Sequence, residues 1–468
     1  MSSARRIFKN LFSMSAAEVS SRVLSVIYQF YLARALSVEG FGVFGSSRNI
    51  TLFFMLFASL GLDAIGTREI AKNSGRINKI VNNILTIRII FGIVVYLLLA
   101  IFVSVVDKPL SEKIVIMIFG INILATNTLL NWVFQGVERL TVYAVRTIIA
   151  NVLNFLGIIL LIHSPDDLIL SAGVISFTLI VNSIWMFLLY VKDYGKFHFE
   201  FDFPLWKEFI LQGIPIGLTF FIIGVYNYQG VVLLNFFATP YYAGLYNAAF
   251  NVIYVATLLS TIIQQVYYPI FSKHSDSNQK LHVFQNYSKI TFSVGTFVPL
   301  FLFVFADKVI YFFGKDYSDS MFTIRILMIA TLFIYISISY FSPLIAWKHE
   351  KKVVYANLSG LIVNLIANYF LIPKLYQNGT AIAALISEFT VFAIMAIIFY
   401  PVFKNLFLIK YLKYLILALI STLPFLYIRL EGLENLILMA SSFISFVILS
   451  FLFKTIQVSE IKKILKKE

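Results

Sequence analysis

The amino-acid sequence predicts an all-α polytopic membrane protein with about fourteen transmembrane helices. Its 468 residues are 60% hydrophobic and only 13% charged, whereas a soluble domain carries about 25% charged residues. The mean hydropathy is +0.87, and apolar stretches of the roughly 20 residues that cross a bilayer core recur along the chain. The polar side chains are too few to cover a water-facing surface of this size, so much of the surface must face lipid.

The apolar stretches define the predicted spans in chain order. In the first half they are Ala16–Leu36, Val43–Leu62, Ile84–Val106, Ile114–Phe134, Val142–Ile162 and Leu168–Val191. In the second half they are Ile210–Phe236, Ala243–Tyr268, Ile290–Phe312, Ile324–Trp347, Val353–Ile372, Thr380–Tyr400, Leu412–Tyr427 and Leu433–Phe453. An even number of spans puts both termini on the same side of the membrane.

Basic residues distinguish the two sides. With a cytoplasmic N-terminus, the inner segments collect most of the lysine and arginine, as in Arg68, Lys72 and Arg76 after the second span, and the outer loops hold few. Cytoplasmic loops carry such an excess. We therefore expect a multi-pass protein of the cell (inner or plasma) membrane with both termini in the cytoplasm. This bias also explains the net charge of +14 without nucleic acid as a partner.

A weak internal repeat suggests how the chain is organised. The segment Phe41–Ile50 aligns with Ala243–Val252, six predicted spans later. An even-numbered repeat keeps its orientation in the membrane, so the two halves are expected to be related by a pseudo-two-fold axis along the membrane normal. We predict an N-terminal six-helix lobe at 1–200, a C-terminal six-helix lobe at 201–405, and two extra helices with a basic cytoplasmic tail at 406–468.

Several kinds of chemistry have no sequence signal. The chain has no cysteine, which excludes disulfides, thiolate metal sites and cysteine nucleophiles. No phosphate-binding loop and no metal-ligand spacing of histidines appears. Connecting loops are too short for a separate soluble domain. We therefore predict no catalytic residues, no metal and no cofactor, and a protein that is not an enzyme.

Three segments resemble a known family. These are Tyr31–Leu36 with Gly40–Phe44 around the start of the second span, Gly61–Glu69 after it, and Leu371–Lys374 with Gly379–Ala384 near the start of the twelfth span. Together they resemble the polysaccharide-biosynthesis flippases, which include O-antigen and capsule-repeat exporters. The sequence departs from the family's pattern where Tyr376-Gln377 stands in place of a common glycine.

The resemblance implies a two-lobed transporter of the superfamily that also contains multidrug extruders and lipid II flippases. Its substrate would be a polyprenyl-diphosphate-linked oligosaccharide, moved by alternating access from the cytoplasmic to the outer leaflet for surface polysaccharide biosynthesis. The implied partners are this lipid-linked substrate, membrane lipids, a coupling ion (H⁺ or Na⁺), and polysaccharide polymerases or glycosyltransferases. An ion-coupled drug or metabolite antiporter of the same fold is the alternative. A membrane-bound polymerase or glycosyltransferase is a third.

Ionisable groups inside the predicted spans are the first candidates for the substrate site, because such groups are rare in membranes and mark function. They are Glu18, Arg22, Arg48, Arg88, Arg146, Arg325 and Glu388. Five of the seven are arginines, which stay charged and bind phosphate oxygens in a bidentate fork. This preponderance of cations favours an anionic diphosphate over a cationic drug.

The first two helices contribute three of these groups. Glu18 and Arg22 are four residues apart and share a helix face. Arg22 is predicted either to bind the diphosphate, with Glu18 as its partner or as a proton site, or to form a self-neutralised pair with Glu18. Arg48 is placed at the opening of the second helix, either in the cavity or reaching the outer headgroups. Lipid II flippases resemble this chain in placing cavity arginines on their first two helices.

The remaining candidates are distributed over later spans. For Arg88 and Arg146, near cytoplasmic helix ends, reaching toward lipid headgroups is favoured over binding the entering substrate. Arg325 is expected to contact headgroups. Glu388, two turns into the twelfth span, is a candidate for coupling to a proton or cation, or for an ordinary hydrogen bond within the bundle.

The seventh span adds polar groups and glycines. Asn227 and Gln229 are candidates for binding sugar, and Gly213, Pro215 and Gly217 would let the helix bend. The alternative for the glycines is close packing of small residues between helices.

Overall fold

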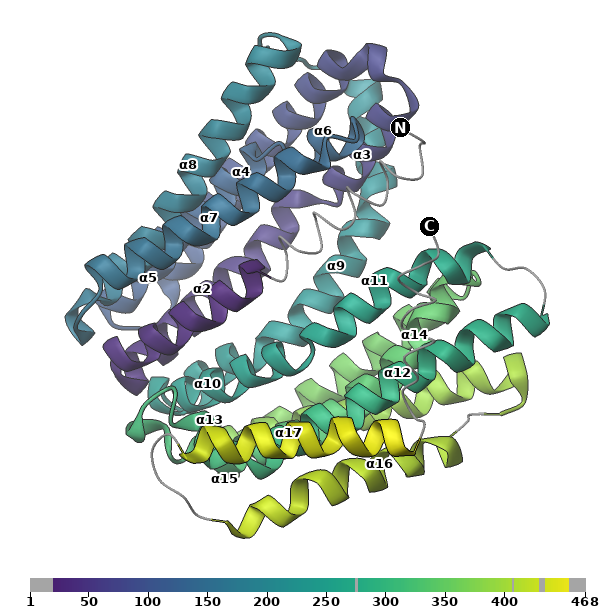
Figure 1. Cartoon of the computed structure of the whole chain (residues 1–468). Coiled ribbons are helices and arrows are strands. Elements are labelled where there is room, and N and C mark those ends of the chain that lie inside the picture. Colours follow the sequence, from purple (N-terminus) through teal and green to yellow (C-terminus); the bar gives the residue numbers. More distant parts are fainter. Residues whose placement is uncertain (1–19, 274–276, 406–407, 429–433, 454–468) are drawn as a thin grey trace. The chain divides into compact units, whose positions relative to one another are not determined.

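The computed structural model describes residues 20–273, 277–405, 408–428 and 434–453 (Figure 1). These residues form helices joined by turns and short connections, and they contain no strand. The chain divides into two compact units, Met1–Gly244 and Leu245–Glu468. The predicted all-α membrane architecture is confirmed, whereas the lobe boundaries after residues 200 and 405 stay predictions.

In the first unit, the described part of the first helix covers 20–35. The helices that follow are α2 (Ser37–Ser59), α3 (Leu62–Lys72), α4 (Ile77–Val105), α5 (Leu110–Thr128), α6 (Asn131–Gly136), α7 (Leu140–Leu161), α8 (Leu168–Tyr194) and α9 (Phe203–Phe237). Within this unit α5 packs on α2, α4 and α8, and α9 packs along α2 and α3.

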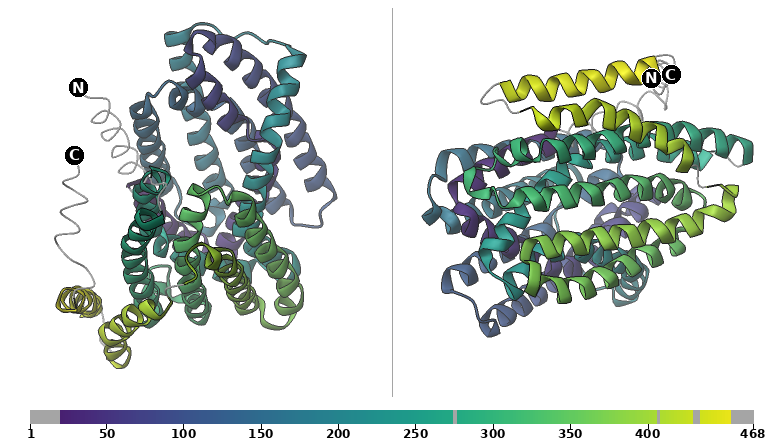
Figure 2. Two further views of the ribbon diagram at one scale, coloured as in Figure 1. Left: turned by 90° about the vertical axis from the view of Figure 1, so that its right-hand side faces the viewer. Right: turned by 90° about the horizontal axis from the view of Figure 1, so that it is seen from below.

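The helix α10 (Pro240–Ala256) contains the boundary between the units. In the second unit it is followed by α11 (Leu258–Lys273), α12 (Ser277–Val304), α13 (Ala306–Ile310), α14 (Ser320–Ala346), α15 (Glu350–Phe403), α16 (Leu408–Thr422) and α17 (Glu434–Leu452). Short 3₁₀ turns cover Ser74–Arg76, Pro165–Asp167, Lys315–Tyr317 and Leu423–Tyr427. The helix α14 packs against α11, α12 and α15, and α16 packs on α12 and α17 (Figure 2). Phe446 of α17 also stacks directly on Phe297 of α12.

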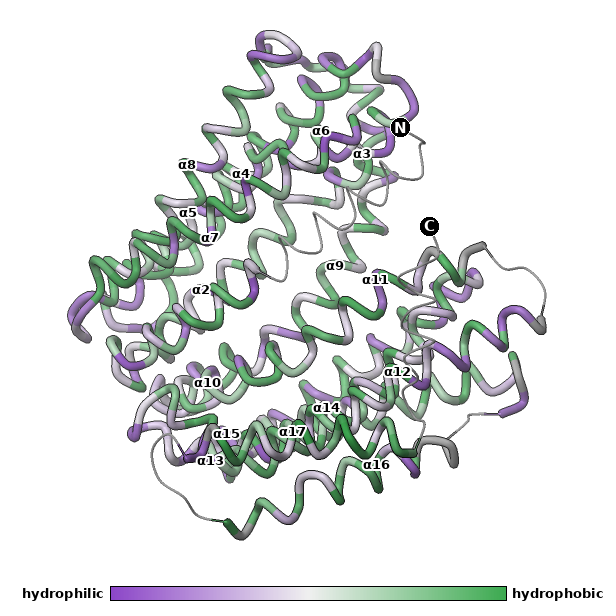
Figure 3. The backbone as a smooth tube through the Cα atoms, in the orientation of Figure 1, coloured by the Kyte–Doolittle hydropathy of each residue, from purple (hydrophilic) through white to green (hydrophobic). Residues whose placement is uncertain are grey.

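Ten helical stretches within the described residues are long and apolar enough to cross a membrane. One of them, Glu350–Val402, contains two predicted spans, and the shorter apolar helices Leu412–Leu426 and Ile437–Leu452 correspond to the last two. The first predicted span begins outside the described residues. Hydrophobic residues run along the helices and hydrophilic ones gather at helix ends and connections (Figure 3).

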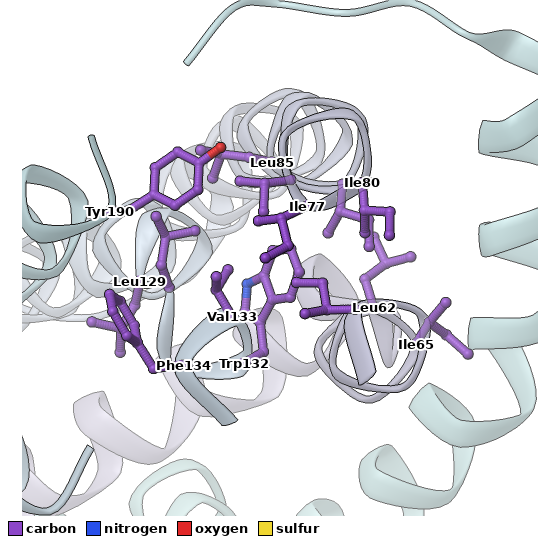
Figure 4. Packing of buried hydrophobic residues seen from close by; sticks show 14 of the residues in the cluster. Leu62, Ile65, Ile77, Ile80, Leu85, Leu129, Trp132, Val133, Phe134 and Tyr190 are labelled. Carbon is purple, nitrogen blue, oxygen red and sulfur yellow. The ribbon is translucent and has the colours of Figure 1, made fainter. Parts of the chain in front are cut away.

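The core of the first unit forms around Trp132 (Figure 4). Its indole is 1% exposed and packs with residues of α3, α4, α6 and α8, including Leu62, Leu85 and Tyr190. A Cβ at Gly66 would lie 2.3 Å from the Trp132 ring. The unpredicted helix α3 therefore comes close to α6 because it carries a glycine at the contact.

Glycines also seat α9 against the turn that joins α2 to α3. This turn uses left-handed backbone, with φ of 45° at Leu60 and 69° at Gly61. A Cβ at Gly213 would lie 2.5 Å from the Leu60 carbonyl oxygen, and one at Gly217 would lie 2.9 Å from the Leu60 carbonyl carbon. The glycines of the seventh span therefore serve close packing, which was the alternative to bending.

A second close approach involves the two aligned glycines of the internal repeat. A Cβ at Gly42, in α2, would lie 1.9 Å from the Pro240 carbonyl oxygen and 2.7 Å from the Gly244 amide nitrogen. A Cβ at Gly244 would lie 1.9 Å from the Val38 carbonyl oxygen. All these atoms belong to the first unit. The first turns of α2 and α10 thus pack backbone on backbone.

We predict that Gly42→Ala lowers the stability of the folded protein by about 1–3 kcal/mol, because the added methyl group meets backbone atoms that cannot rotate away. The matched control is Gly173→Ala in α8, where a Cβ would have nothing within 4 Å. It should be neutral or stabilising, because alanine favours a helix over glycine by about 1 kcal/mol. Thermal unfolding in detergent measures both. Equal midpoints for the two variants would contradict the predicted packing.

Candidate functional site

The predicted site residues of the first two helices lie in the first unit. Arg22 is partly buried on the first helix, and Glu18 lies outside the described residues. Arg48 is the central residue of α2, because this helix begins at Ser37 rather than at the apolar stretch. It stands about 16 Å along the axis from the helix start, so its predicted place at the helix opening is wrong.

The surroundings of Arg48 belong to the contact between α2 and α9. The neighbouring Asn49 is 9% exposed, and its amide Nδ2 donates to the carbonyl oxygen of Tyr228 at 3.2 Å. Arg48 itself is partly buried. A charged group at the middle of a membrane-length helix faces the bundle interior or a water-filled space in most proteins, which keeps Arg48 a candidate for binding substrate.

Arg88 does not extend toward lipid headgroups. Its side chain is 1% exposed. One guanidinium nitrogen, Nη1, donates to Oδ1 of Asp63 in the first turn of α3, and Nη2 donates to the Thr126 carbonyl oxygen at 2.7 Å. The favoured headgroup contact is therefore wrong. Because the guanidinium already binds a carboxylate and a carbonyl of α5, a direct contact with substrate stays a prediction.

The other candidates are separated by the helices that carry them. On α9, Gln229 is 3% exposed, whereas Asn227 is exposed and donates to the Ile223 carbonyl oxygen at 2.9 Å. Residues two apart on a helix point to different faces, so a single surface cannot present both side chains. On α7, Arg146 is partly buried and lies 6.0 Å from the ring centre of Tyr143.

Glu388 belongs to the second unit. It is partly buried on α15 and lies close enough to Tyr246 of α10 to interact with it electrostatically. Tyr246 is 4% exposed, and its ring stacks on that of Phe250.

A buried polar cluster, which the sequence did not predict, ties α2, α5 and α9 together in the first unit. Asn235 Nδ2 donates to Glu112 Oε1 and to Ser46 Oγ, the latter at 2.9 Å. Lys108 Nζ donates to the Asn235 carbonyl oxygen at 2.6 Å and lies 3.8 Å from Glu112 Oε1. Glu112 and Asn235 are each 2% exposed. The only sequence signal was the spacing of four between Lys108 and Glu112.

Outside the predicted spans, Asp202 is fixed by two donors at the start of α9. Lys79 Nζ lies 2.9 Å from Oδ2, and the Leu205 amide donates to Oδ1 at 3.2 Å. The hydrogen bond from Lys79, followed by that from Leu205, holds the pKa of Asp202 below its usual value. Asp202 therefore contributes to the free energy of unfolding at neutral pH, and this contribution is lost as the pH falls through the lowered pKa.

The contacts of Arg88 lead to a stability prediction. Arg88→Ala should cost about 1–3 kcal/mol, because the Thr126 carbonyl oxygen and the half-exposed Asp63 each lose a charge-assisted hydrogen bond from the buried guanidinium. The double variant Arg88→Ala with Asp63→Asn should lose much less stability than the sum of the losses in the two single variants. The control is Arg139→Ala, since Arg139 pairs with Asp193 at the surface and exposed pairs contribute about 0–1 kcal/mol. Chemical denaturation measures all four variants. A fully stable but transport-deficient Arg88→Ala would instead assign Arg88 to the substrate.

The chain is similar in sequence to curated proteins of O-antigen transport and capsular polysaccharide biosynthesis. The chain is 25% identical over 397 residues to the "Putative O-antigen transporter" of Shigella dysenteriae, with 81% of this chain and 96% of the relative covered. It is 24% identical over 414 residues to the capsular polysaccharide biosynthesis protein CapF of Staphylococcus aureus, with 85% and 100% covered.

Solved structures show the same fold. The lipid II flippase MurJ in an inward closed conformation superposes with a TM-score of 0.75 at 16% identity, covering 94% of this chain and 98% of that one. An inward-facing multidrug transporter of the MATE family superposes with a TM-score of 0.65 at 13% identity, covering 84% and 99%. The family model for polysaccharide biosynthesis proteins matches residues 7–275, which is more than half of the chain. The chain therefore belongs to the polysaccharide biosynthesis protein family.

Proposed function

We propose that this protein is a flippase that moves a polyprenyl-diphosphate-linked oligosaccharide from the cytoplasmic to the outer leaflet by alternating access. The observation that carries the proposal is the similarity, over 81–85% of this chain, to O-antigen and capsule proteins together with arginines in the helices of the first unit. The protein would act in the cell membrane, with both termini in the cytoplasm, and supply surface polysaccharide biosynthesis.

The substrate explains why the cations are arginines. A diphosphate keeps its negative charge in a low-dielectric cavity only when donors replace its water, and arginine offers paired donors that match phosphate oxygens. Arg22 and Arg48, on successive helices, would bind the diphosphate, with Glu18 as the partner of Arg22. Arg146, Arg88, Asn227 and Gln229 remain further candidates for the diphosphate or the sugars.

An ion-coupled antiporter for drugs or metabolites is the alternative within the same fold. Its support is the similarity of the fold to MATE transporters. A pocket for organic cations calls for uncompensated carboxylates. Among the seven ionisable groups of the predicted spans, five are arginines and two are glutamates, which favours an anionic substrate.

Deleting the gene tests the function. If the protein is the flippase, its loss should leave diphosphate-linked oligosaccharide in the inner leaflet and should remove the surface glycan. Lipid extraction detects the first change and glycan blotting the second. The Arg22→Ala variant should transport at least about tenfold more slowly, because a charge-assisted hydrogen bond is worth about 1.5–3 kcal/mol. Arg325→Ala is the control. Unchanged lipid-linked pools in the deletion strain, with altered drug sensitivity, would support the antiporter.

Coupling has a separate test in Glu388. If this carboxyl group binds the driving proton or cation, Glu388→Gln removes the dependence of transport on the ion gradient, because the amide does not titrate. Flux into vesicles is measured with and without an imposed H⁺ or Na⁺ gradient. Glu350→Gln, an exposed change at the start of the same helix, is the control. Wild-type flux at every gradient would leave Glu388 with a structural role alone.

A further inference from the structure

The connection between α8 and α9 has a strictly alternating sequence that the transport function does not use. Residues 196–203 read Lys-Phe-His-Phe-Glu-Phe-Asp-Phe. Side chains of an extended segment point alternately to opposite faces. The four phenylalanines therefore share one face, and the lysine, the histidine and the two acidic residues share the other. We call residues 196–203 the Phe segment.

One edge of the Phe segment is bound to α4. At every second residue a backbone N–H donates to a side-chain oxygen of that helix: His198 to Asn82 Oδ1 at 3.2 Å, Glu200 to Thr86 Oγ1 at 3.2 Å, and Asp202 to Asn83 Oδ1 at 3.1 Å. This pattern holds the segment in one orientation. The amide and hydroxyl side chains of α4 therefore determine which face turns outward.

The outward face is aromatic. Phe199, Phe201 and Phe203 are 60%, 54% and 66% exposed. Trp206 extends this surface, with ring centres 5.5 Å from Phe201 and 5.4 Å from Phe203. Contiguous exposed aromatics on a protein surface mark an interaction site or a membrane contact.

The position of the Phe segment limits what can cover these rings. The candidate spans on either side end at Tyr194 and begin at Phe203, so the segment connects two helices at a membrane surface. For Phe197, Phe199 and Phe201, the described part of the chain records no hydrogen-bond partner of the backbone N–H. Such backbone cannot lie in hydrocarbon. The headgroup layer remains, where aromatic side chains gather.

Charge identifies the lipid. Asp202 pairs with Lys79 and Asp193 with Arg139, so these two acidic groups of the region are neutralised inside the first unit. Three exposed lysines have no ion-pair partner among the described residues: Lys192, Lys196 and Lys207. Lysines next to a membrane surface are attracted to anionic headgroups.

We propose that the Phe segment binds an anionic lipid surface at this end of the helices. The rings of Phe199, Phe201 and Phe203 enter the boundary between headgroups and acyl chains, and the lysines bind lipid phosphate. Because α4 holds the other edge, this contact sets the depth at which α9 begins.

The natural absence of cysteine allows a direct test on the full chain. Single cysteines at Phe199, Phe201 and Glu200 are spin-labelled in nanodiscs of phosphatidylcholine with phosphatidylglycerol. The ratio of accessibility to oxygen over accessibility to a water-soluble nickel chelate should be several-fold higher at 199 and 201 than at the control position 200. High nickel accessibility at all three positions overturns the proposal. So does protection of 199 and 201 from both reagents, which would mean a protein contact.

The lipid charge is tested with the same label at 199. The label should lie deeper in the anionic nanodiscs than in nanodiscs of phosphatidylcholine alone, and Lys192→Gln, Lys196→Gln and Lys207→Gln combined should abolish the difference. A depth that is the same in both lipids for the unmodified lysines overturns the assignment to anionic lipid. Unchanged helix content and gel-filtration profile verify that each variant is folded.

Discussion

The constraint on which the rest of this structure depends is that lipid offers the backbone no hydrogen bonds. Every segment in the hydrocarbon must satisfy its own N–H and C=O groups, and in the described residues it does so as helix. Helices in lipid gain little from hydrophobic burial, because lipid tails are as apolar as leucine. Their association must therefore come from shape and from a few buried polar contacts.

Both devices occur in the first unit. Backbone approaches backbone at Gly42 with Gly244 and at Gly61 with Gly213 and Gly217, which lets α2 contact α10 and α9 at short range. Two buried polar links supplement these contacts. Arg88 joins α3 to α5, and the group around Asn235 joins α2, α5 and α9. Both links connect helix ends to their neighbours, where terminal backbone groups lack partners.

This division bears on transport. A carrier must keep each bundle intact while its substrate site changes access, so groups that tie one bundle together differ from groups that bind substrate. Arg88 and Glu112 have partners that tie the first unit together. Arg48, at the centre of α2 and partly buried, has no such pair among the described residues. The proposed diphosphate site therefore centres on the first two helices, and the Phe segment adds a separate contact with lipid.

The sequence by itself determined the fold class and nearly all of the spans. Helix length and apolarity follow from bilayer thickness, a property that needs no knowledge of neighbours. It also marked unusual positions. Tyr376-Gln377 stands where the family commonly has a glycine, and the backbone of Tyr376, with φ of 49° and ψ of −127°, lies in a region that glycine adopts freely. The motif that contains Asp63 was also identified from the sequence, but its partner Arg88 was not.

Only the tertiary structure decided which polar groups meet. Asp63 and Arg88 are 25 residues apart in sequence, and Asn235 and Glu112 are 123 apart, so no local pattern links them. The glycines of α9 were compatible with bending or with packing until the turn at Leu60 was seen against them. Arg48 was predicted to open the second helix because hydropathy marks only where the apolar residues begin. The helical backbone begins earlier, at Ser37. Local sequence determines which elements form, and packing determines which of their side chains meet.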